Sequence, residues 1–273
     1  LPYSNDMGLQ APMFTPEEIA DIKQKMGIDL SAAYPPLPLM LDDEVIEAQP
    51  DQAGLTALYL HESVRYMREH SDEPFFLYFA HMYVHLPIYV QPRFAAESRN
   101  GSYGAAVRCI DWAADVLLAE LRALGLEENT IVIFTSDNGA LARPGEGSNV
   151  PLRSKKGTTW EGGQRVPCIV RWPRQIAAGT ESTEVVTAMD LYPTRARWCG
   201  AELPADRTID GRDIADVLQS PGDVESPHDA FFYYRGPNLE AVRVGRWKLH
   251  VYKGVGYGTE GSPVAELYDL VAD

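Results

Sequence analysis

Cysteine is scarce in this sequence, because the 273 residues include three, Cys109, Cys168 and Cys199. Their spacings match neither a zinc-binding cluster nor a redox-active pair, so the cysteines indicate no site of either kind. Long apolar runs are also missing, since no stretch of about 18 or more residues is purely apolar. The sequence therefore predicts no membrane span.

Basic residues are outnumbered by acidic ones, with 24 Lys and Arg against 39 Asp and Glu and a net charge of −15. Such a surface repels nucleic acids and anionic lipids, so neither is expected as a partner. An anionic substrate would have to bind at a local cluster of cationic side chains. Hydrophobic residues make up 45% and charged residues 23% of the chain. This mixture is typical of globular proteins and excludes a disordered or fibrous chain.

Short apolar runs and amphipathic segments follow one another in the first part of the chain. Residues 75–80, 130–135 and 168–172 are largely apolar runs, as in parallel strands that are buried on both faces. Residues 51–70 and 103–124 have apolar side chains at three- and four-residue steps, which predicts helices. Strand, helix and strand at this spacing predict an α/β fold with a largely parallel sheet flanked by helices.

The pattern changes after about residue 201. Residues 231–234, 241–244 and 247–252 are short runs joined by glycine-containing turns, which predicts an antiparallel meander. We therefore expect two domains, an α/β domain over residues 1–205 and a small C-terminal antiparallel α+β subdomain over residues 206–273.

Asp137 and Asn138 come directly after the predicted strand 130–135. Ligands of open α/β sheets bind at such strand ends. A carboxylate and an amide carbonyl are hard oxygen donors that suit calcium or magnesium. The alternative is a tight turn, because Asp-Asn-Gly tolerates turn geometry well.

Two further candidate features are a loop with two lysines, which follows this pair in the chain, and a histidine, which precedes it. Residues 153–163 form a glycine-rich segment, here called the lysine loop, with the adjacent Lys155 and Lys156. A lysine ammonium is a compact charge that can bind one oxygen of an anion. The other candidate is His85, just beyond the predicted strand 75–80. The alternatives are a solvated surface loop for the lysines and a packing or capping role for His85.

Several motifs together resemble, in order and spacing, the later two-thirds of a type I sulfatase, a family of the alkaline phosphatase superfamily. The resemblance is to its arylsulfatase A and N-acetylgalactosamine-6-sulfatase branch. The motifs are Tyr78-Phe79-Ala80 through His85-Leu86-Pro87, Ser136-Asp137-Asn138-Gly139, Lys156-Gly157-Thr158-Thr159-Trp160-Glu161-Gly162-Gly163, Asp190-Leu191-Tyr192-Pro193-Thr194 and Glu266-Leu267-Tyr268-Asp269-Leu270. The opening Leu1-Pro2-Tyr3-Ser4-Asn5-Asp6-Met7 resembles the segment that follows the first half of that family's active site.

The resemblance implies a sulfuric ester hydrolase that uses a formylglycine nucleophile and Ca²⁺. Asp137 and Asn138 would be metal ligands, with the metal acting as Lewis acid and template. Lys156 would bind a sulfate oxygen and stabilise developing charge, and His85 would bind sulfate and protonate the leaving oxygen.

Weaker expectations concern the surroundings of this site. Arg153 and Arg165 would orient groups or form ion pairs. Tyr83, Tyr257 and His250 would line the entrance for the substrate.

The sequence also departs from the family pattern. Formylglycine is made from the Cys or Ser of a Cys/Ser-x-Pro-x-Arg motif, and none of the three cysteines stands in one. The resemblance thus implies a chain truncated at both ends, which lacks the N-terminal half with the nucleophile and is inactive alone. The alternatives are a phosphate or phosphonate ester hydrolase of the same superfamily, or a non-catalytic fragment.

The expected partner is a sulfated small molecule, sugar or lipid, and we expect self-association because a missing half would expose apolar sheet surface. The resemblance implies an extracytoplasmic location, which is periplasmic, secreted or lysosomal.

Overall fold

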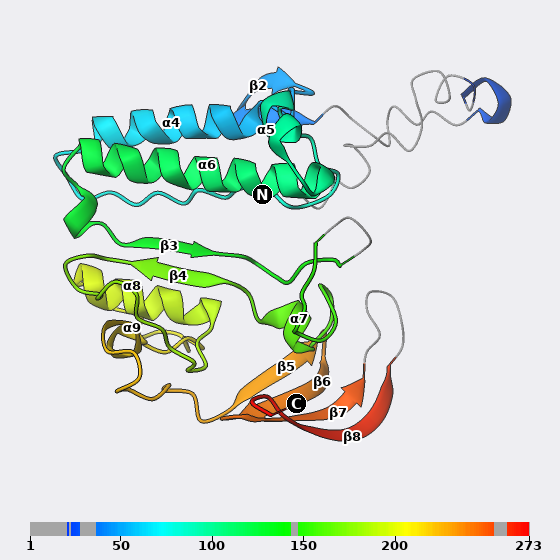
Figure 1. The fold of residues 1–273 in the computed structure, drawn as a ribbon, viewed down its shortest axis with the longest axis vertical. Helices are drawn as coiled ribbons and strands as arrows, with labels where there is room; N and C mark the ends of the chain where they lie inside the picture. The colour runs from blue at the N-terminus through cyan, green and yellow to red at the C-terminus, as the bar shows by residue number, and fades with distance from the viewer. Residues whose placement is uncertain (1–20, 22, 28–36, 143–146, 254–260, 273) are drawn as a thin grey trace. The chain divides into compact units, whose positions relative to one another are not determined.

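The computed structural model describes residues 21, 23–27, 37–142, 147–253 and 261–272 (Figure 1). The chain divides into two compact units, Leu1–Gly125 and Leu126–Asp273, and each is described by itself. The expected domain boundary after residue 205 falls inside the second unit and stays a prediction. No helix in the described ranges is long and apolar enough to cross a membrane.

The first unit contains a β-hairpin and a layer of packed helices. Its elements are β1 (Pro38–Leu41), β2 (Glu44–Ala48), α4 (Leu55–Glu69), α5 (Pro92–Glu97) and α6 (Gly101–Ala123). Helices α4 and α6 lie side by side (Figure 1). The buried side of α6 includes Ala105, Ala106 and Ala113, and such small side chains let a neighbouring helix approach closely. The helices predicted from the apolar spacing are confirmed.

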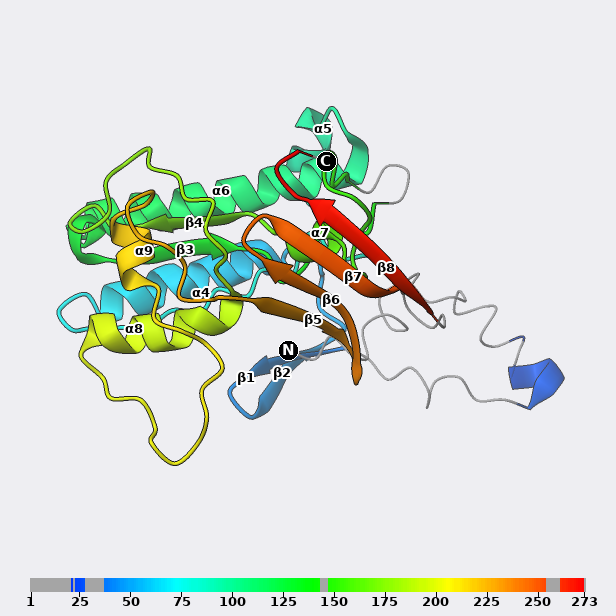
Figure 2. The same ribbon diagram turned by 90° about the horizontal axis from the view of Figure 1, so that it is seen from below.

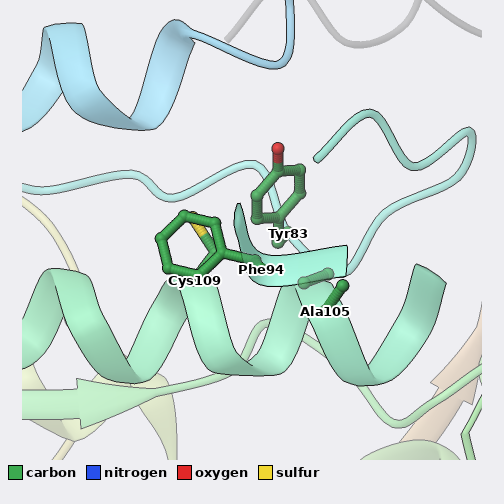
Figure 3. Packing of buried hydrophobic residues seen from close by; sticks show 5 residues of the cluster. Tyr83, Phe94, Ala105 and Cys109 are labelled. Atoms are coloured by element: carbon green, nitrogen blue, oxygen red, sulfur yellow. The ribbon is translucent and has the colours of Figure 1, made fainter. Parts of the chain in front are cut away.

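A small hydrophobic core joins α5 and α6 to the chain segment before them. Tyr83, Phe94, Ala105 and Cys109 belong to it, and Figure 3 shows Tyr83 and Phe94 against α6. The partly buried residues Met82, Val84, Ile88 and Val90 pack against the same cluster. The segment that carries His85 is therefore held on α6 by apolar contacts.

The predicted strand at residues 75–80 is not confirmed. These residues belong to none of the sheets that the described chain forms. Phe76 and Tyr78 are 64% and 75% exposed, so the run is not buried on both faces either. An apolar run indicates burial, but a strand also needs a neighbour that supplies its hydrogen bonds. None of the described strands lies beside residues 75–80 and forms such bonds with them.

The second unit begins with a two-stranded sheet. Its elements before residue 220 are the 3₁₀-helix η2 (Glu127–Asn129), β3 (Val132–Thr135), α7 (Glu161–Gln164), β4 (Cys168–Arg171), the 3₁₀-helix η3 (Ala188–Asp190), α8 (Leu191–Cys199) and α9 (Ala215–Gln219). Both predicted strands are present, but Val132 pairs with Arg171 and Thr135 with Cys168 in an antiparallel register. The expectation of a largely parallel sheet is wrong for the described residues. The connection folds at one end of the strands, whereas parallel strands need a crossover.

The motif Asp190–Thr194 has a structural role in this unit. Asp190 is fully buried, and its carboxylate accepts hydrogen bonds from the N–H groups of Thr187 and Arg212, at 2.6 and 2.7 Å. The His228 Nε2 atom lies 2.9 Å from both Asp190 oxygens. These contacts join the start of α8 to two loops that are distant in sequence.

The chain ends in a four-stranded antiparallel sheet, which confirms the predicted meander (Figure 2). In order across the sheet, its strands are β5 (Phe231–Arg235), β6 (Asn238–Val244), β7 (Trp247–Lys253) and β8 (Ser262–Asp269). One face buries Tyr233, Lys248 and His250, all at most 7% exposed. The other face carries a row of paired residues, namely Phe232, Val242, Leu249 and Leu267.

Candidate active site

Asp137 and Asn138 lie just beyond the end of β3, where Asp137 is exposed and Asn138 is half-buried. The Asn138 Nδ2 atom donates a hydrogen bond to Asp137 Oδ2 at 2.5 Å, so the two side chains point toward each other. The Ser136 hydroxyl donates to the Asn138 carbonyl at 3.0 Å and closes the turn. The turn and the oxygen donors therefore occur in the same segment, and the two interpretations of this motif do not exclude each other.

Gly139 brings this turn into contact with α7. Its N–H donates to the Gly163 carbonyl at 3.1 Å. A Cβ atom at position 139 would lie 1.8 Å from the Gly162 carbonyl oxygen, closer than any side chain tolerates. Glycine is required here because the two backbones touch.

Lys156 lies next to the same turn. Its N–H donates to the Ala140 carbonyl at 3.0 Å, and the residue is half-buried, whereas Lys155 is exposed. Asn149 completes the junction, since its Oδ1 accepts from the Ala140 N–H and its Nδ2 donates to Ala140 O, both at 2.9 Å. The structure thus brings the lysine loop and the Asp137–Asn138 turn together within the second unit.

Asn149 is a residue that the sequence analysis missed. Its Nδ2 also donates to the Ser154 carbonyl at 3.0 Å, so one side chain joins both segments of the site. Nothing in the pattern around it distinguishes it from an ordinary loop asparagine, because its partners are backbone atoms.

The end of the lysine loop is buried against the C-terminal sheet. Thr159, Trp160 and Glu161 are at most 8% exposed. The Trp160 ring stacks on His250 of β7 at a centroid distance of 3.8 Å. Lys248 and Glu240, on β7 and β6, also contact this part of the loop. Sequence reasoning missed both residues.

Arg153 and Arg165 flank the loop in different ways. The Arg153 guanidinium lies 3.9 Å from the centroid of the Trp160 ring and donates to the Tyr268 hydroxyl at 2.9 Å. Its main contacts are thus a cation–π interaction and a neutral hydrogen bond. Arg165 donates its backbone N–H to Glu161 O at 2.8 Å, and its side chain is exposed.

His85 belongs to the first unit and is exposed. Its Nδ1 lies 2.7 Å from the Leu86 carbonyl, which can only accept, so Nδ1 carries the hydrogen. The Tyr83 hydroxyl donates to the Tyr89 carbonyl, and the His85 N–H donates to Met82 O at 3.1 Å. These bonds hold the turn around His85 and fix the orientation of its ring.

Two of the three residues expected at the substrate entrance are elsewhere. Tyr83 is 9% exposed and part of the core on α6, and burial raises its pKa to about 12. His250 is 1% exposed, and burial is the main cause that lowers its pKa to about 4. Both expectations are wrong, because the side chains pack inside their units. Tyr257 lies outside the described residues.

The donor set at Asp137 and Asn138 fits calcium in kind. Both side chains offer hard oxygen atoms just beyond the end of a strand, with Asp137 exposed and Asn138 half-buried. Calcium takes about six to eight oxygen ligands, so these two would be a minor part of its shell. The described ranges contain no group of three or more His, Cys, Asp or Glu residues that could hold a metal.

Known proteins resemble this chain in both sequence and structure. The family model "Sulfatase" matches residues 15–201, and the model "N-sulphoglucosamine sulphohydrolase, C-terminal" matches residues 155–273. Mouse steryl-sulfatase is 43% identical over 213 residues, which are 75% of this chain and 34% of that protein. Rat N-acetylgalactosamine-6-sulfatase is 39% identical over 237 residues, which are 85% of this chain and 45% of that protein. The chain thus spans less than half the length of these relatives.

Solved structures show the same likeness. The PsFucS1 sulfatase from Pseudoalteromonas sp. aligns with a TM-score of 0.74 at 28% identity, over 83% of this chain and 48% of that one. The structure of Ps i-CgsB in complex with k-i-k-neocarrahexaose aligns with a TM-score of 0.73 at 25% identity, over 95% of this chain and 56% of that one. The fold is therefore that of sulfatases, and the resemblance inferred from the motifs is confirmed. With a family model that matches more than half of its residues, this chain belongs to the sulfatase family.

Proposed function

We propose that this chain supplies part of the active site of a sulfate ester hydrolase. The observation that carries the proposal is the junction in the second unit. There Lys156 N–H bonds Ala140 O at 3.0 Å, and Gly139 N–H bonds Gly163 O at 3.1 Å. These bonds join the backbone of the lysine loop to the segment that follows Asp137 and Asn138, which supports a shared site for the lysine and the two oxygen donors. Such a combination suits the binding of the anionic sulfate group of an ester in an otherwise acidic protein.

Lys156 and the Asp137–Asn138 pair have separate roles in this proposal. The Lys156 ammonium binds a sulfate oxygen and stabilises the negative charge that develops as the S–O bond breaks. Asp137 and Asn138 would hold Ca²⁺, which when bound supplies positive charge that neutralises the sulfate. The hydrogen bond between their side chains keeps both in one small region, so the oxygen atoms can face one ion after a rotation of the Asn138 amide.

His85 would act as the general acid. Its Nδ1–H donates to the Leu86 carbonyl, which orients the ring and leaves Nε2 to carry the transferable proton. An imidazolium at this position protonates the leaving oxygen, so that an alcohol departs rather than an alkoxide.

The proposed substrate is a sulfate ester of a small molecule, sugar or lipid. This rests on relatives that are named steryl-sulfatase and N-acetylgalactosamine-6-sulfatase. We also propose an extracytoplasmic location, as the resemblance implies, and self-association. The exposed side chains of Phe232, Leu249 and Leu267 on one sheet face support self-association.

The chain by itself is proposed to be inactive. It spans 34% and 45% of the two relatives named above, and none of its cysteines stands in a motif that would yield a formylglycine. In this proposal Lys156 stabilises charge and His85 transfers a proton, but neither side chain replaces the nucleophile that attacks sulfur.

Substitution of Lys156 tests the proposed function. In a complete gene product that hydrolyses aryl sulfates, we expect Lys156→Ala to reduce kcat by on the order of 10²-fold or more, by comparison with the loss of one oxyanion donor. The melting temperature should change little, because the side chain is on a loop and half-buried. Lys155→Ala is the matched control, since the neighbouring side chain is exposed.

Steady-state kinetics with an aryl sulfate and an aryl phosphate distinguish the outcomes. An unchanged kcat for Lys156→Ala would contradict the role of this lysine. Turnover of phosphate esters without turnover of sulfate esters would contradict the proposed reaction.

A further inference from the structure

Three buried residues come soon after Lys156, and all of them contact the C-terminal sheet. Thr159, Trp160 and Glu161 are 5%, 7% and 8% exposed. Their partners on the sheet include Lys248 and Glu240, each 1% exposed. Two charged side chains buried this deeply on one sheet face need an explanation, because burial of charge is costly unless it is fully paired.

The Lys248 ammonium contacts three groups, namely a carbonyl, a carboxylate and an aromatic ring. It donates to the Thr159 carbonyl at 2.6 Å and to Glu161 Oε1 at 2.8 Å. It also lies 3.7 Å from the centroid of the Tyr233 ring. Burial lowers the pKa of Lys248, and the charge of Glu161 opposes this shift. Two of the three contacts belong to the end of the lysine loop.

Glu240 holds the same loop residue from the neighbouring strand. Its Oε2 accepts from the Thr159 hydroxyl at 2.7 Å, while its Oε1 accepts from Arg235 Nε at 2.8 Å. The hydroxyl and the carbonyl of Thr159 are thus both bound to the sheet, by Glu240 and Lys248. One residue of the loop is fixed at two atoms by two strands.

In the chain, Lys156 lies between the turn after β3 and Thr159, the residue that the sheet holds. The Lys156 N–H bonds Ala140 O at 3.0 Å. The carbonyl of the same peptide group, that of Lys155, accepts hydrogen bonds from the N–H and the hydroxyl of Thr158, at 3.2 and 2.7 Å. The peptide group that precedes Lys156 is therefore bound through both its N–H and its carbonyl, and Lys156 is three residues from the buried Thr159.

We infer that Lys248 and Glu240 are positioning residues that hold the lysine loop in the arrangement in which Lys156 meets the sulfate group. This inference rests on the proposed function of Lys156. Buried ion pairs often stabilise a fold no better than apolar residues of similar size, and in some proteins their role is to select one arrangement of their partners. A loop misplaced by about 1 Å is enough to slow a reaction about 10²-fold.

Limited proteolysis of the 273-residue chain tests the positioning without any assay of activity. Trypsin cleaves after Lys155 and Lys156, so the rate at this site reports how often the loop leaves its position. We expect Lys248→Met to accelerate this cleavage by about tenfold or more, with cleavage after Arg65 and Arg68 in α4 unchanged. Lys253→Met is the matched control, because it removes the same group from the same strand at a half-exposed ion pair with Glu266.

A second variant covers the case that Lys248→Met does not fold. Thr159→Val keeps the shape of the side chain and removes the hydroxyl that Glu240 accepts from. It should accelerate the same cleavage selectively. Unchanged cleavage in these variants would overturn the inference, and so would equal acceleration at all sites, since the contacts would then stabilise the whole unit only.

Kinetics in an active complete protein add a readout that a purely structural role would not change. If Lys248 acts through Lys156, Lys248→Met lowers kcat by about tenfold alone but by less than about twofold in a Lys156→Ala background. Additive losses would overturn the inference. One combination separates the two proposals: Lys248→Met accelerates cleavage of the lysine loop selectively, but Lys156→Ala leaves kcat unchanged. The sheet would then position the loop, while the proposed function of Lys156 would fail.

Discussion

At the scale of single residues, close backbone contacts decide the geometry of the candidate site. Gly139, Gly162 and Gly163 each lie so near another carbonyl oxygen that a Cβ atom would come within 1.8 to 2.4 Å of it. Only glycine allows such contacts without moving the chain. The sequence shows these glycines, but their partners in space appear only in the folded structure.

Gly139→Ala should therefore destabilise the second unit. The added methyl group would meet the Gly162 carbonyl, which is backbone and cannot rotate away, so the Gly139–Gly163 hydrogen bond must break. We expect a loss of about 2 kcal/mol or more in the free energy of unfolding, from the overlap and the lost bond. Urea denaturation measures this loss. Gly54→Ala is the control, because its nearest neighbour would be at an ordinary 3.4 Å, and an equal loss there would contradict the explanation.

At the scale of elements, strand β7 shows why a local pattern is not enough. Trp247, Lys248, Leu249 and His250 alternate between apolar and polar side chains, which by itself suggests that the polar ones face solvent. The structure has the opposite arrangement, with Lys248 and His250 1% exposed and Leu249 38% exposed. The end of the lysine loop supplies the stacking and charged partners that make the buried positions acceptable.

His250 should make the stability of the chain depend on pH. Burial, together with the charges of Lys248 and Arg153, lowers its pKa to about 4, against the opposing carboxylates of Glu266 and Glu161. The unfolded chain then binds more protons than the folded one between about pH 6.5 and 4. The contribution of His250 to the free energy of unfolding is fully present above about pH 6.5. It is lost as the pH falls through this range, by about 2 kcal/mol between pH 7 and 5.

His250→Phe is expected to remove this dependence. Phenylalanine keeps an aromatic ring on Trp160, and neither ring nitrogen of His250 has a hydrogen-bond partner among the described residues. Urea denaturation at pH 7 and 5 should show a smaller loss of stability in the variant than in the unchanged chain. His81, whose pKa burial also lowers to about 4, leaves a residual dependence. Leu249→Phe is the control, and the explanation fails if both variants keep the original dependence.

Other elements show where sequence patterns succeed. Helices α4 and α6 follow from apolar spacing, because a helix forms its hydrogen bonds within itself and needs only one face to be buried. The C-terminal meander follows from short runs and turns between neighbouring strands. Local patterns did not predict that β3 and β4 are antiparallel, or that residues 75–80 form no strand. Both outcomes depend on distant parts of the chain.

At the scale of the whole molecule, the proposed calcium site depends on how many oxygen donors the chain can bring together. The described ranges contain no cluster of three or more metal-binding side chains, and Asp137 and Asn138 supply two donors. We expect the 273-residue chain to bind calcium weakly, with a Kd of roughly 1 mM or above.

Calorimetric titration with calcium measures this affinity directly. Asp137→Ala should abolish the weak binding, and Asp206→Ala, at an exposed aspartate paired with Arg207, should leave it unchanged. Binding at micromolar calcium would contradict the expectation, because it would require a fuller set of ligands in this chain.

The sequence by itself determined the family, the candidate residues Asp137, Asn138, Lys156 and His85, the helices α4 and α6, and the C-terminal meander. These follow from motifs and periodicities that are local to short segments. Only the tertiary structure decided that Gly139 touches α7, that Asn149 joins the two segments of the site, and that Lys248 and Glu240 hold Thr159. Such contacts join residues that are distant in the chain, and their energies depend on burial and direction that no local pattern contains.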